Sequence, residues 1–190
     1  MTTIDSTASR QRLLELVRER AYRDGLDIVL SSGKPSTFYI NGKKISLHPE
    51  GLTLIARLML EELRSLPEVT AIGGLTMGAD PIAAAVSAFS WESGQNLDAF
   101  LVRKEAKGHG AGGRIEGDLV EGQKVAIIED TITTGASAMR AIEAVRGVGA
   151  IPVVVMALAD REDEDADGFR AEFDVRPLLS MSQIRGDADA

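Results

Sequence analysis

The sequence contains no cysteine, few aromatic residues and no excess of positive charge. The lack of cysteine excludes disulfide bonds, thiolate metal sites and a cysteine nucleophile. Phe, Trp and Tyr account for only 4 % of the 190 residues, so the core must be mainly aliphatic. The formal net charge of -8 argues against a general nucleic-acid binder, which needs a basic surface. A small anionic ligand is still compatible with this charge, because a few clustered Lys and Arg side chains could bind it.

Metal-ligand spacing and long apolar runs are also missing. The two histidines, His48 and His109, are far apart in the sequence and do not have the spacing of metal ligands. No apolar run approaches the roughly 20 residues of a membrane-spanning helix. The charged N-terminal segment lacks the apolar region of a signal peptide. The sequence therefore predicts a cytoplasmic protein that does not interact with membranes.

Apolar runs alternate with amphipathic stretches along most of the chain. A helix is expected over residues 8–24, short strands over 27–30 and 38–40, and a second helix from Pro49. Later runs are typical of buried parallel strands (69–72, 99–102, 125–128 and 153–159) and of intervening helices (81–91 and 137–148). This alternation predicts an α/β fold with helices on both faces of a parallel sheet. No linker or repeat divides the chain, so residues 1–190 are expected to form a single domain.

Acidic and hydroxyl side chains follow the predicted strand 125–128. An α/β sheet usually binds its ligand at this end of its strands. A helix N-terminus and hydroxyl groups suit a phosphate, and a glycine lets the backbone approach it closely. Two carboxylates beside an anion site make sense if they accept hydrogen bonds from sugar hydroxyls. The segment therefore predicts a site for a ribose 5-phosphate; an ordinary strand-to-helix turn capped by Thr or Ser is the alternative. Its members are Glu129, Asp130, Thr131, Ile132, Thr133, Thr134, Gly135, Ala136 and Ser137.

The segment VAIIEDTITTGAS, residues 125–137, resembles the phosphoribosyl-pyrophosphate signature of type I phosphoribosyltransferases. That signature usually has two acidic residues, which Glu129 and Asp130 supply here. The resemblance implies a type I phosphoribosyltransferase-like fold, in which helices flank a parallel sheet and a small N-terminal hood, mainly residues 1–48, covers the site. It also implies that residues 129–137 bind phosphoribosyl pyrophosphate (PRPP), with Glu129 and Asp130 in catalytic roles at the ribose hydroxyls.

A basic, glycine-rich loop, residues 103–114, follows the second strand. Ordering so many glycines costs entropy, which a ligand with concentrated negative charge could offset; a solvated basic hairpin is the alternative. The segment RKEAKGHGAGGRIEG resembles the mobile loop of orotate phosphoribosyltransferases. The resemblance implies that Arg103, Lys104, Lys107 and His109 bind PRPP, and that Lys107 assists the departure of pyrophosphate. It also implies a homodimer in which each loop closes over the neighbouring active site.

Residues 72–81 resemble the pyrophosphate loop of the same family. This resemblance implies that Thr76 and Met77 contact PRPP, and that a non-proline cis peptide bond joins Leu75 and Thr76. A plain strand-to-helix turn is the alternative for this segment. Many relatives have Lys where Met77 stands, so a direct charge contact is missing here.

Residues 30–41 resemble the family's N-terminal hood, in which an aromatic pair covers the flat base. Phe38 is expected to stack on the base, whereas packing within the hood is almost equally compatible with Tyr39. Some relatives have Lys at the position of Ser31, and Lys34 is a candidate to replace that charge.

Arg161 follows the last predicted strand, and the resemblance implies that it holds the orotate carboxylate, with Thr133 also at the base. The implied reaction transfers the phosphoribosyl group from PRPP to orotate, giving orotidine 5'-monophosphate and pyrophosphate in de novo pyrimidine synthesis. Mg²⁺ is expected to bind mainly through the ligand's oxygens and water. Two alternatives stay open: a phosphoribosyltransferase for another base, and a non-catalytic regulator that senses PRPP and binds RNA or DNA. The acidic composition disfavours the regulator, so no nucleic-acid partner is expected.

Overall fold

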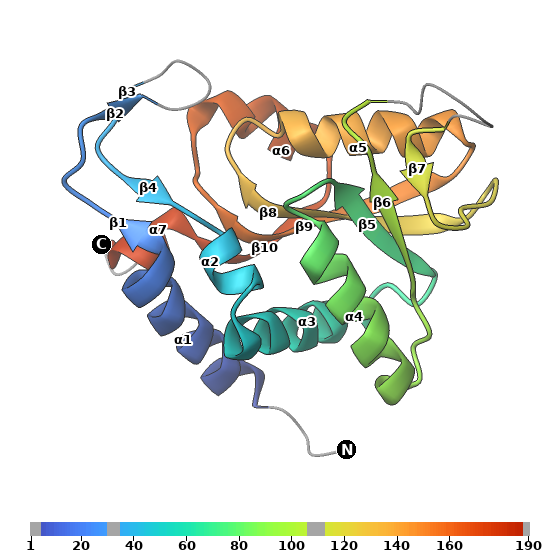
Figure 1. Ribbon diagram of the computed structural model, residues 1–190, viewed down its shortest axis with the longest axis horizontal. Helices are drawn as coiled ribbons and strands as arrows, with labels where there is room; N and C mark the ends of the chain where they lie inside the picture. Colours follow the sequence, from blue (N-terminus) through green and yellow to red (C-terminus); the bar gives the residue numbers. More distant parts are fainter. Residues whose placement is uncertain (1–4, 30–34, 106–112, 188–190) are drawn as a thin grey trace.

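A six-stranded sheet forms the centre of the computed structural model, which describes residues 5–29, 35–105 and 113–187 (Figure 1). The strand order is β10-β9-β8-β5-β6-β7. Neighbouring strands run parallel, except that β7 pairs antiparallel with β6 at one edge. The strands are β5 (Ala71–Leu75), β6 (Asp98–Val102), β7 (Ile115–Glu116), β8 (Lys124–Ile132), β9 (Ile151–Asp160) and β10 (Val175–Ser180).

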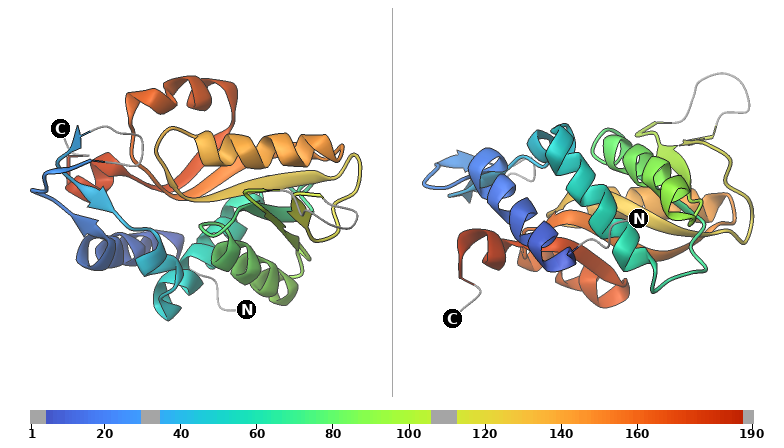
Figure 2. Two further views of the ribbon diagram at one scale, coloured as in Figure 1. Left: turned by 45° about the horizontal axis from the view of Figure 1, so that its top comes forward. Right: turned by 90° about the horizontal axis from the view of Figure 1, so that it is seen from below.

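Helices cover both faces of this sheet, so the predicted α/β architecture is confirmed. Helices α1, α3 and α4 pack on one face, and α5 packs on the other (Figures 1 and 2). A π-helical turn, Val17–Ala21, extends α1. The long helices are α1 (Ser6–Leu16), α3 (Pro49–Leu63), α4 (Asp80–Ser93) and α5 (Ala136–Gly147). The shorter ones are α2 (Lys43–Ser46), α6 (Asp167–Glu172) and α7 (Met181–Arg185), with a 3₁₀ turn at Glu164–Ala166.

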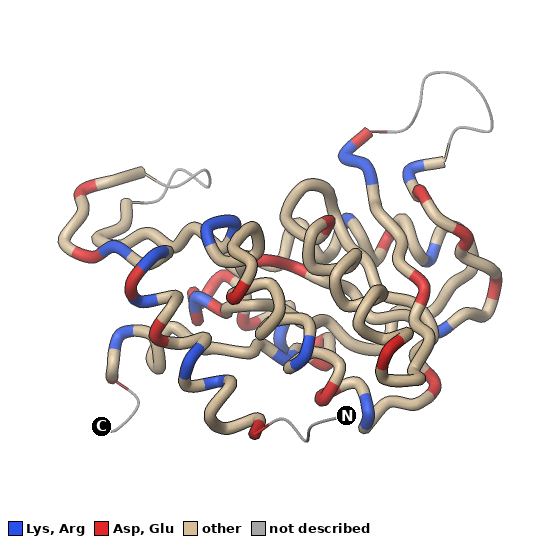
Figure 3. The backbone as a smooth tube through the Cα atoms, turned by 60° about the horizontal axis from the view of Figure 1, so that its bottom comes forward, with Lys and Arg blue, Asp and Glu red and all other residues tan. Residues whose placement is uncertain are grey.

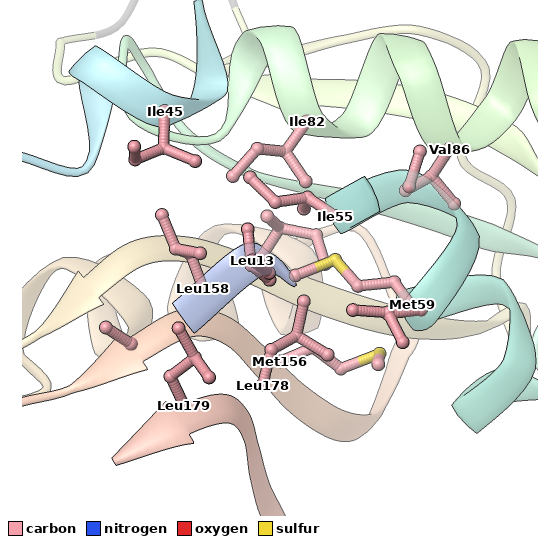
Figure 4. Packing of buried hydrophobic residues seen from close by; sticks show 14 of the residues in the cluster. Leu13, Ile45, Ile55, Met59, Ile82, Val86, Met156, Leu158, Leu178 and Leu179 are labelled. Carbon is pink, nitrogen blue, oxygen red and sulfur yellow. The ribbon is translucent and has the colours of Figure 1, made fainter. Parts of the chain in front are cut away.

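Strand alternation divides the core into two clusters, one on each face of the sheet. Ala126 and Ile128 of β8 belong to the cluster with α1, α3 and α4, whereas Val125 and Ile127 belong to the cluster with α5. Figure 4 shows part of the first cluster, where side chains from these helices meet side chains of β9 and β10. Every side chain labelled there is aliphatic or Met, which agrees with the low aromatic content of the sequence.

A small hood of short elements lies beside the carboxyl ends of β8 and β9. Strand β1 pairs antiparallel with β4, and β2 pairs antiparallel with β3, before α2 leads into α3. Each of these strands is two residues long: β1 (Tyr22–Arg23), β2 (Ile28–Val29), β3 (Pro35–Ser36) and β4 (Tyr39–Ile40). The short strands expected over 27–30 and 38–40 correspond to β2 and β4.

Strand β8 is longer than the sequence predicts. It continues beyond its expected end at Ile128, because its ladder with β9 extends as far as the pair Ile132 and Asp160. Glu129 and Asp130 therefore lie inside a paired strand rather than in a loop. The ladder fixes the backbone of this acid pair.

Strands β7 and β10 and the helices α2, α6 and α7 are not expected from the sequence. Strand β10, with the sequence VRPLLS, contains arginine and proline and so differs from an apolar run. It pairs with β9 at the sheet edge, where a proline is tolerated. Among the helices of the described residues, none is long and apolar enough to cross a membrane.

Candidate active site

A cleft of about 850 Å³ opens between the hood and the carboxyl ends of β8 and β9. Parallel α/β sheets usually bind ligands at this edge. The cleft brings together six of the predicted site residues: Phe38, Asp130, Thr131, Thr133, Thr134 and Arg161. Its other lining residues come from the hood segments 27–29 and 35–43 and from the acidic turn 163–165.

Glu129 and Asp130 differ in their exposure to the cleft, although their side chains lie close enough to interact. Asp130 lines the cleft, whereas Glu129 is buried with 8 % of its surface exposed. Burial, followed by the negative charge of Asp130, raises the pKa of Glu129 to about 8. The raised pKa favours the protonated form of Glu129, which lowers the repulsion between the two neighbouring acids.

Lys43, the first residue of α2, forms an ion pair with Asp130 across the cleft. Its Nζ lies 2.9 Å from Oδ2 of Asp130, while the backbone N–H of Thr131 donates to Oδ1 at 2.9 Å. The hydrogen bond to Asp130 raises the pKa of Lys43 above its usual value. Sequence reasoning missed Lys43: the pair Lys43-Lys44 is visible, but its acidic partner lies 87 positions away.

Two glycines allow the backbone to approach Asp130 closely. A Cβ atom placed on Gly42 would lie 3.1 Å from Cβ of Asp130, and one on Gly78 would lie 2.9 Å from its Oδ1. Side chains at either position would push against the carboxylate. Asp130 is thus enclosed by the backbone of the hood on one side and by the turn after β5 on the other.

The loop between β8 and α5 consists of Thr133, Thr134 and Gly135. Gly135 has a φ of +76°, a left-handed conformation that favours glycine, and it precedes the first turn of α5. A Cβ at Gly135 would lie 2.5 Å from the ring of Phe169. The Thr134 hydroxyl accepts a hydrogen bond from the N–H of Ala136 at 3.3 Å. Helix α5 therefore begins beside the cleft, where its first N–H groups and the threonines suit a phosphate.

Three other residues of the predicted PRPP segment do not line the cleft with the threonines. Ile132 is 1 % exposed and packs in the core, so any contact it makes with a ligand must come from its backbone. Ala136 and Ser137 lie in the first turn of α5, where their N–H groups are available to a ligand in the way expected of a helix start.

Arg161 leaves the end of β9 and passes under the hood with 6 % of its surface exposed. Its guanidinium carbon lies 4.4 Å from the ring centroid of Phe38, and its Nη2 donates to Oγ of Ser36 at 3.4 Å. Its Nε lies 3.2 Å from Oδ2 of Asp163, within ion-pair distance but without hydrogen-bond geometry. The predicted orotate-binding residues Arg161 and Phe38 are therefore in direct contact.

Phe38 is more enclosed than its expected stacking role suggests. It is 9 % exposed, and a second guanidinium, that of Arg185, lies 4.1 Å from its ring centroid. A base stacked on the side occupied by Arg161 would displace that guanidinium. Tyr39, which also lines the cleft, is 43 % exposed and is the more open of the two rings.

A partly buried ion pair holds the turn that presents Arg161. Asp160 accepts hydrogen bonds from Nη1 of Arg170 at 3.0 and 3.1 Å and from the N–H of Glu162 at 2.8 Å. Nη2 of Arg170 also donates to the backbone carbonyl of Asp163 at 2.8 Å. Glu162 has a left-handed φ of 57°. The backbone on both sides of Arg161 is thus fixed by hydrogen bonds.

The cis peptide bond after β5 joins Thr76 and Met77, not Leu75 and Thr76 as expected. The shift by one residue follows from the strand ladder, which pairs Leu75 with Val102 and continues through the Thr76 N–H, a donor to the Val102 carbonyl at 2.9 Å. The turn therefore begins one residue later. Met77 is 72 % exposed.

The basic loop is tied at its two ends. The N–H of Arg103 donates to the carbonyl of Arg114 at 2.7 Å, and Nε of Arg114 donates to the carbonyl of Arg103 at 3.1 Å. The side chain of Arg103 binds Glu116 at 2.6 Å, and Lys104 is exposed. Neither Arg103 nor Lys104 lines the cleft as the described residues form it. The predicted site residues Lys107 and His109, like Ser31 and Lys34 of the hood, lie outside the described residues.

Charges of both signs are distributed over the molecule. Figure 3 shows Lys and Arg interspersed with Asp and Glu along the backbone. Within the ranges that the structure covers, no group of three or more His, Asp or Glu side chains is placed to hold a metal ion.

Relatives of this chain are known from sequence, although no protein-family model matches it. It is 45 % identical over 170 residues to orotate phosphoribosyltransferase from Nostoc sp., covering 89 % of this chain and 81 % of that protein. It is 44 % identical over 186 residues to orotate phosphoribosyltransferase from Rhodopseudomonas palustris, covering 95 % of this chain and 98 % of that protein. The chain belongs to the orotate phosphoribosyltransferase family.

Solved structures of orotate phosphoribosyltransferases share the fold. The crystal structure of the Mycobacterium tuberculosis enzyme in complex with Fe(III) dicitrate matches with a TM-score of 0.80 and 40 % identity, covering 93 % of this chain and 98 % of that one. The same enzyme in complex with PRPP matches with a TM-score of 0.75 and 36 % identity, covering 93 % and 99 %. Adenine phosphoribosyltransferase from Leishmania donovani, 18 % identical with a TM-score of 0.64, shares the fold alone. The predicted type I phosphoribosyltransferase fold is confirmed.

Proposed function

We propose that this orotate phosphoribosyltransferase family member transfers the 5-phosphoribosyl group from PRPP to orotate, giving orotidine 5'-monophosphate and pyrophosphate in pyrimidine synthesis. The observation that carries the proposal is that one cleft brings together the Asp130 carboxylate, the threonines at 131, 133 and 134, and the buried guanidinium of Arg161. The carboxylate and hydroxyls suit a phosphorylated ribose, and the guanidinium suits the carboxylate of orotate. Family membership supports orotate rather than another base.

In this reaction the base nitrogen attacks the anomeric carbon while pyrophosphate leaves. Positive charge develops on the ribose ring and negative charge on the leaving group, and preorganised charges must stabilise both. We assign Asp130 to accept hydrogen bonds from the ribose hydroxyls and to face the developing cation. Glu129, protonated beside it, supports that geometry from inside the strand.

The remaining contacts to PRPP are divided between two segments. The 5-phosphate is assigned to Thr131, Thr133 and Thr134, with the backbone of Ile132 and of Gly135, Ala136 and Ser137. The pyrophosphate is assigned to Thr76, Met77, Arg103, Lys104, Lys107 and His109, with Lys107 assisting its departure. Orotate is assigned to Arg161 through its carboxylate, to Thr133 and to Phe38, whose ring becomes available for stacking if Arg161 turns toward the ligand.

Mg²⁺ is proposed to accompany PRPP. It prefers oxygen ligands, keeps several waters, and is usually bound by one or two carboxylates together with substrate phosphates. The oxygen donors of this cleft match these preferences. Asp130 presents a carboxylate to the cleft, and the phosphates of PRPP would bring the other oxygens. When bound, the ion offsets negative charge on the pyrophosphate.

The test is formation of orotidine 5'-monophosphate from orotate and PRPP by the purified protein, with and without Mg²⁺. Uracil, adenine and guanine serve as competing bases. Product from orotate alone supports the proposal, and transfer to a purine contradicts it. Binding of PRPP without transfer to any base would indicate a regulator instead.

The proposed assembly is a homodimer of single-domain subunits, residues 1–190, with loop 103–114 serving the neighbouring site. Its location is proposed to be the cytoplasm, because the highly charged PRPP does not cross a bilayer unaided. Lys107→Ala and Asp130→Asn variants test the shared site. Mixed dimers would contain one site with both residues intact, so random exchange of equal amounts restores about one quarter of the wild-type activity. No recovery after verified exchange contradicts sharing.

A further inference from the structure

Lys43 has no role in the assignments above, although it makes the direct contact with Asp130. Its Nζ–Oδ2 distance of 2.9 Å is typical of a charge-assisted hydrogen bond. Both residues line the cleft, so the contact lies at the proposed binding surface rather than behind it. The Asp130 side chain is 13 % exposed and that of Lys43 47 %. The lysine therefore approaches a largely enclosed carboxylate from the open side of the cleft.

Lys43 brings a positive charge into contact with the Asp130 carboxylate, next to a second acidic residue. Glu129 is the adjacent acidic group, and the backbones at Gly42, Gly78 and Thr131 pack around the carboxylate without adding charge. Tyr39 lies near enough to Lys43 to influence its protonation. The cleft must accept a ligand with several negative charges next to this acid pair, which costs free energy unless a nearby cation offsets the repulsion.

We propose that Lys43 is a positioning residue of the active site, which holds the Asp130 carboxylate toward the ribose hydroxyls and offsets the negative charge beside which PRPP binds. The assignment rests on the proposed function only in naming PRPP as the ligand. It deepens that function by giving the hood an electrostatic part in donor binding, in addition to covering the base. Because Lys43 opens α2 and Asp130 lies in β8, the ion pair also joins the hood to the sheet.

A purely structural role for Lys43 predicts different behaviour. As a simple tether, its loss would lower thermal stability and weaken all ligands alike. As a charge partner, its loss weakens PRPP selectively, and a second cation at the same position restores the affinity.

The experiment measures the affinities for PRPP and for orotate by calorimetry with Mg²⁺, at neutral pH and constant ionic strength. The variants are Lys43→Met, Lys43→Gln and Lys43→Arg. Lys44→Met is the matched control, because it removes the same charge from the exposed next position, and among the described residues no ion pair joins Lys44 to a carboxylate. Thermal unfolding of each variant shows that it is folded. Orotate transfer by the wild type is assayed separately.

Lys43→Met and Lys43→Gln should weaken PRPP binding by about tenfold at neutral pH, an order of magnitude usual for a lost contact between close opposite charges. Lys43→Arg should restore affinity to within about threefold, and Lys44→Met should match the wild type. The proposal is overturned if Lys43→Met and Lys43→Gln bind PRPP like the wild type, or if Lys43→Arg is as weak as they are. Lys43-dependent PRPP binding in a wild type that does not transfer to orotate sustains this assignment while rejecting the proposed function.

Discussion

The two walls of the cleft differ in the length of the strands that form them, and therefore in their rigidity. The core wall consists of β8, the loop Thr133–Gly135 and the end of β9, and its two strands are nine and ten residues long. The hood wall consists of residues 22–29 and 35–43, whose four strands have two residues each. Isolated two-stranded pairs of this size are marginal in water. The ribose of PRPP is assigned to the core wall, which is the more rigid of the two.

The hood wall depends on site residues for its own placement. Arg161 contacts Phe38 and Ser36, and Lys43 contacts Asp130, so groups proposed to bind substrate also join the two walls. A ligand that binds Arg161 or Asp130 therefore changes the contacts that attach the hood to the core wall. Substitutions in the core wall should therefore affect folding and turnover, whereas substitutions between the walls should affect substrate affinity.

Gly135→Ala should give the largest effect, because it disturbs the core wall itself. A Cβ at this left-handed position would lie 2.5 Å from the Phe169 ring. Left-handed strain and overpacking together should lower the free energy of unfolding by about 2–4 kcal/mol. Urea denaturation measures this loss. Gly147→Ala, at the end of α5 with nothing within 4 Å of its added Cβ, is the control and should not destabilise. Equal stability of the two variants would show that the loop adapts.

Asp130→Asn should retain the fold but lower kcat by at least about tenfold, or ~1.4 kcal/mol of barrier. The amide keeps the shape of the side chain while removing the charge that faces the developing cation. Steady-state kinetics with saturating orotate and PRPP measures the change. Glu164→Gln, which removes a charge from the exposed rim of the same cleft, should leave kcat unchanged. Wild-type turnover in Asp130→Asn would remove this carboxylate from the mechanism.

Arg161→Ala should act between the walls, raising the KM for orotate by about fivefold while PRPP affinity stays nearly intact. The lost contact is the guanidinium assigned to the orotate carboxylate. Arg185→Ala is the matched control, because it also contacts the Phe38 ring but does not line the cleft. If PRPP affinity falls and orotate affinity does not, the base has been placed on the wrong side of the hood.

Glu129→Gln should show the smallest effect, a pH-dependent gain in stability. Glu129 has a pKa of about 8 in the folded protein, above its ordinary value of 4.5, so the folded state binds the extra proton. The associated stability is complete below about pH 4.5 and is lost as the pH rises through about 8. Gln imitates the protonated form and avoids that loss. Its Tm should exceed that of the wild type by a few degrees at pH 9 and by less at pH 6, whereas exposed Glu68→Gln should show no trend. A difference that does not change with pH contradicts the buried-proton assignment.

Sequence patterns predict the parts of this molecule that depend on local chemistry. The apolar strands and the segment Glu129–Ser137 are visible because their residues are contiguous. The contact between Lys43 and Asp130 joins positions 87 residues apart, so no local sequence pattern predicts it. The protonation of Glu129 depends on burial by the folded sheet, so its pKa follows from tertiary structure rather than from residue type. Strand β10 likewise depends on tertiary structure. Its sequence contains proline and arginine and does not indicate a strand, and it becomes one by pairing with β9.

The tie between Arg103 and Arg114 limits how far the proposed lid can act. Ten residues separate these two positions, and an extended chain advances at most about 3.5 Å per residue. A segment that leaves the tie and returns to it cannot place its midpoint farther than about 20 Å away. In any dimer that shares the loop, the neighbouring cleft must fall inside that radius extended by the length of one side chain. Arrangements of two copies that fail this distance criterion are excluded by chain length alone.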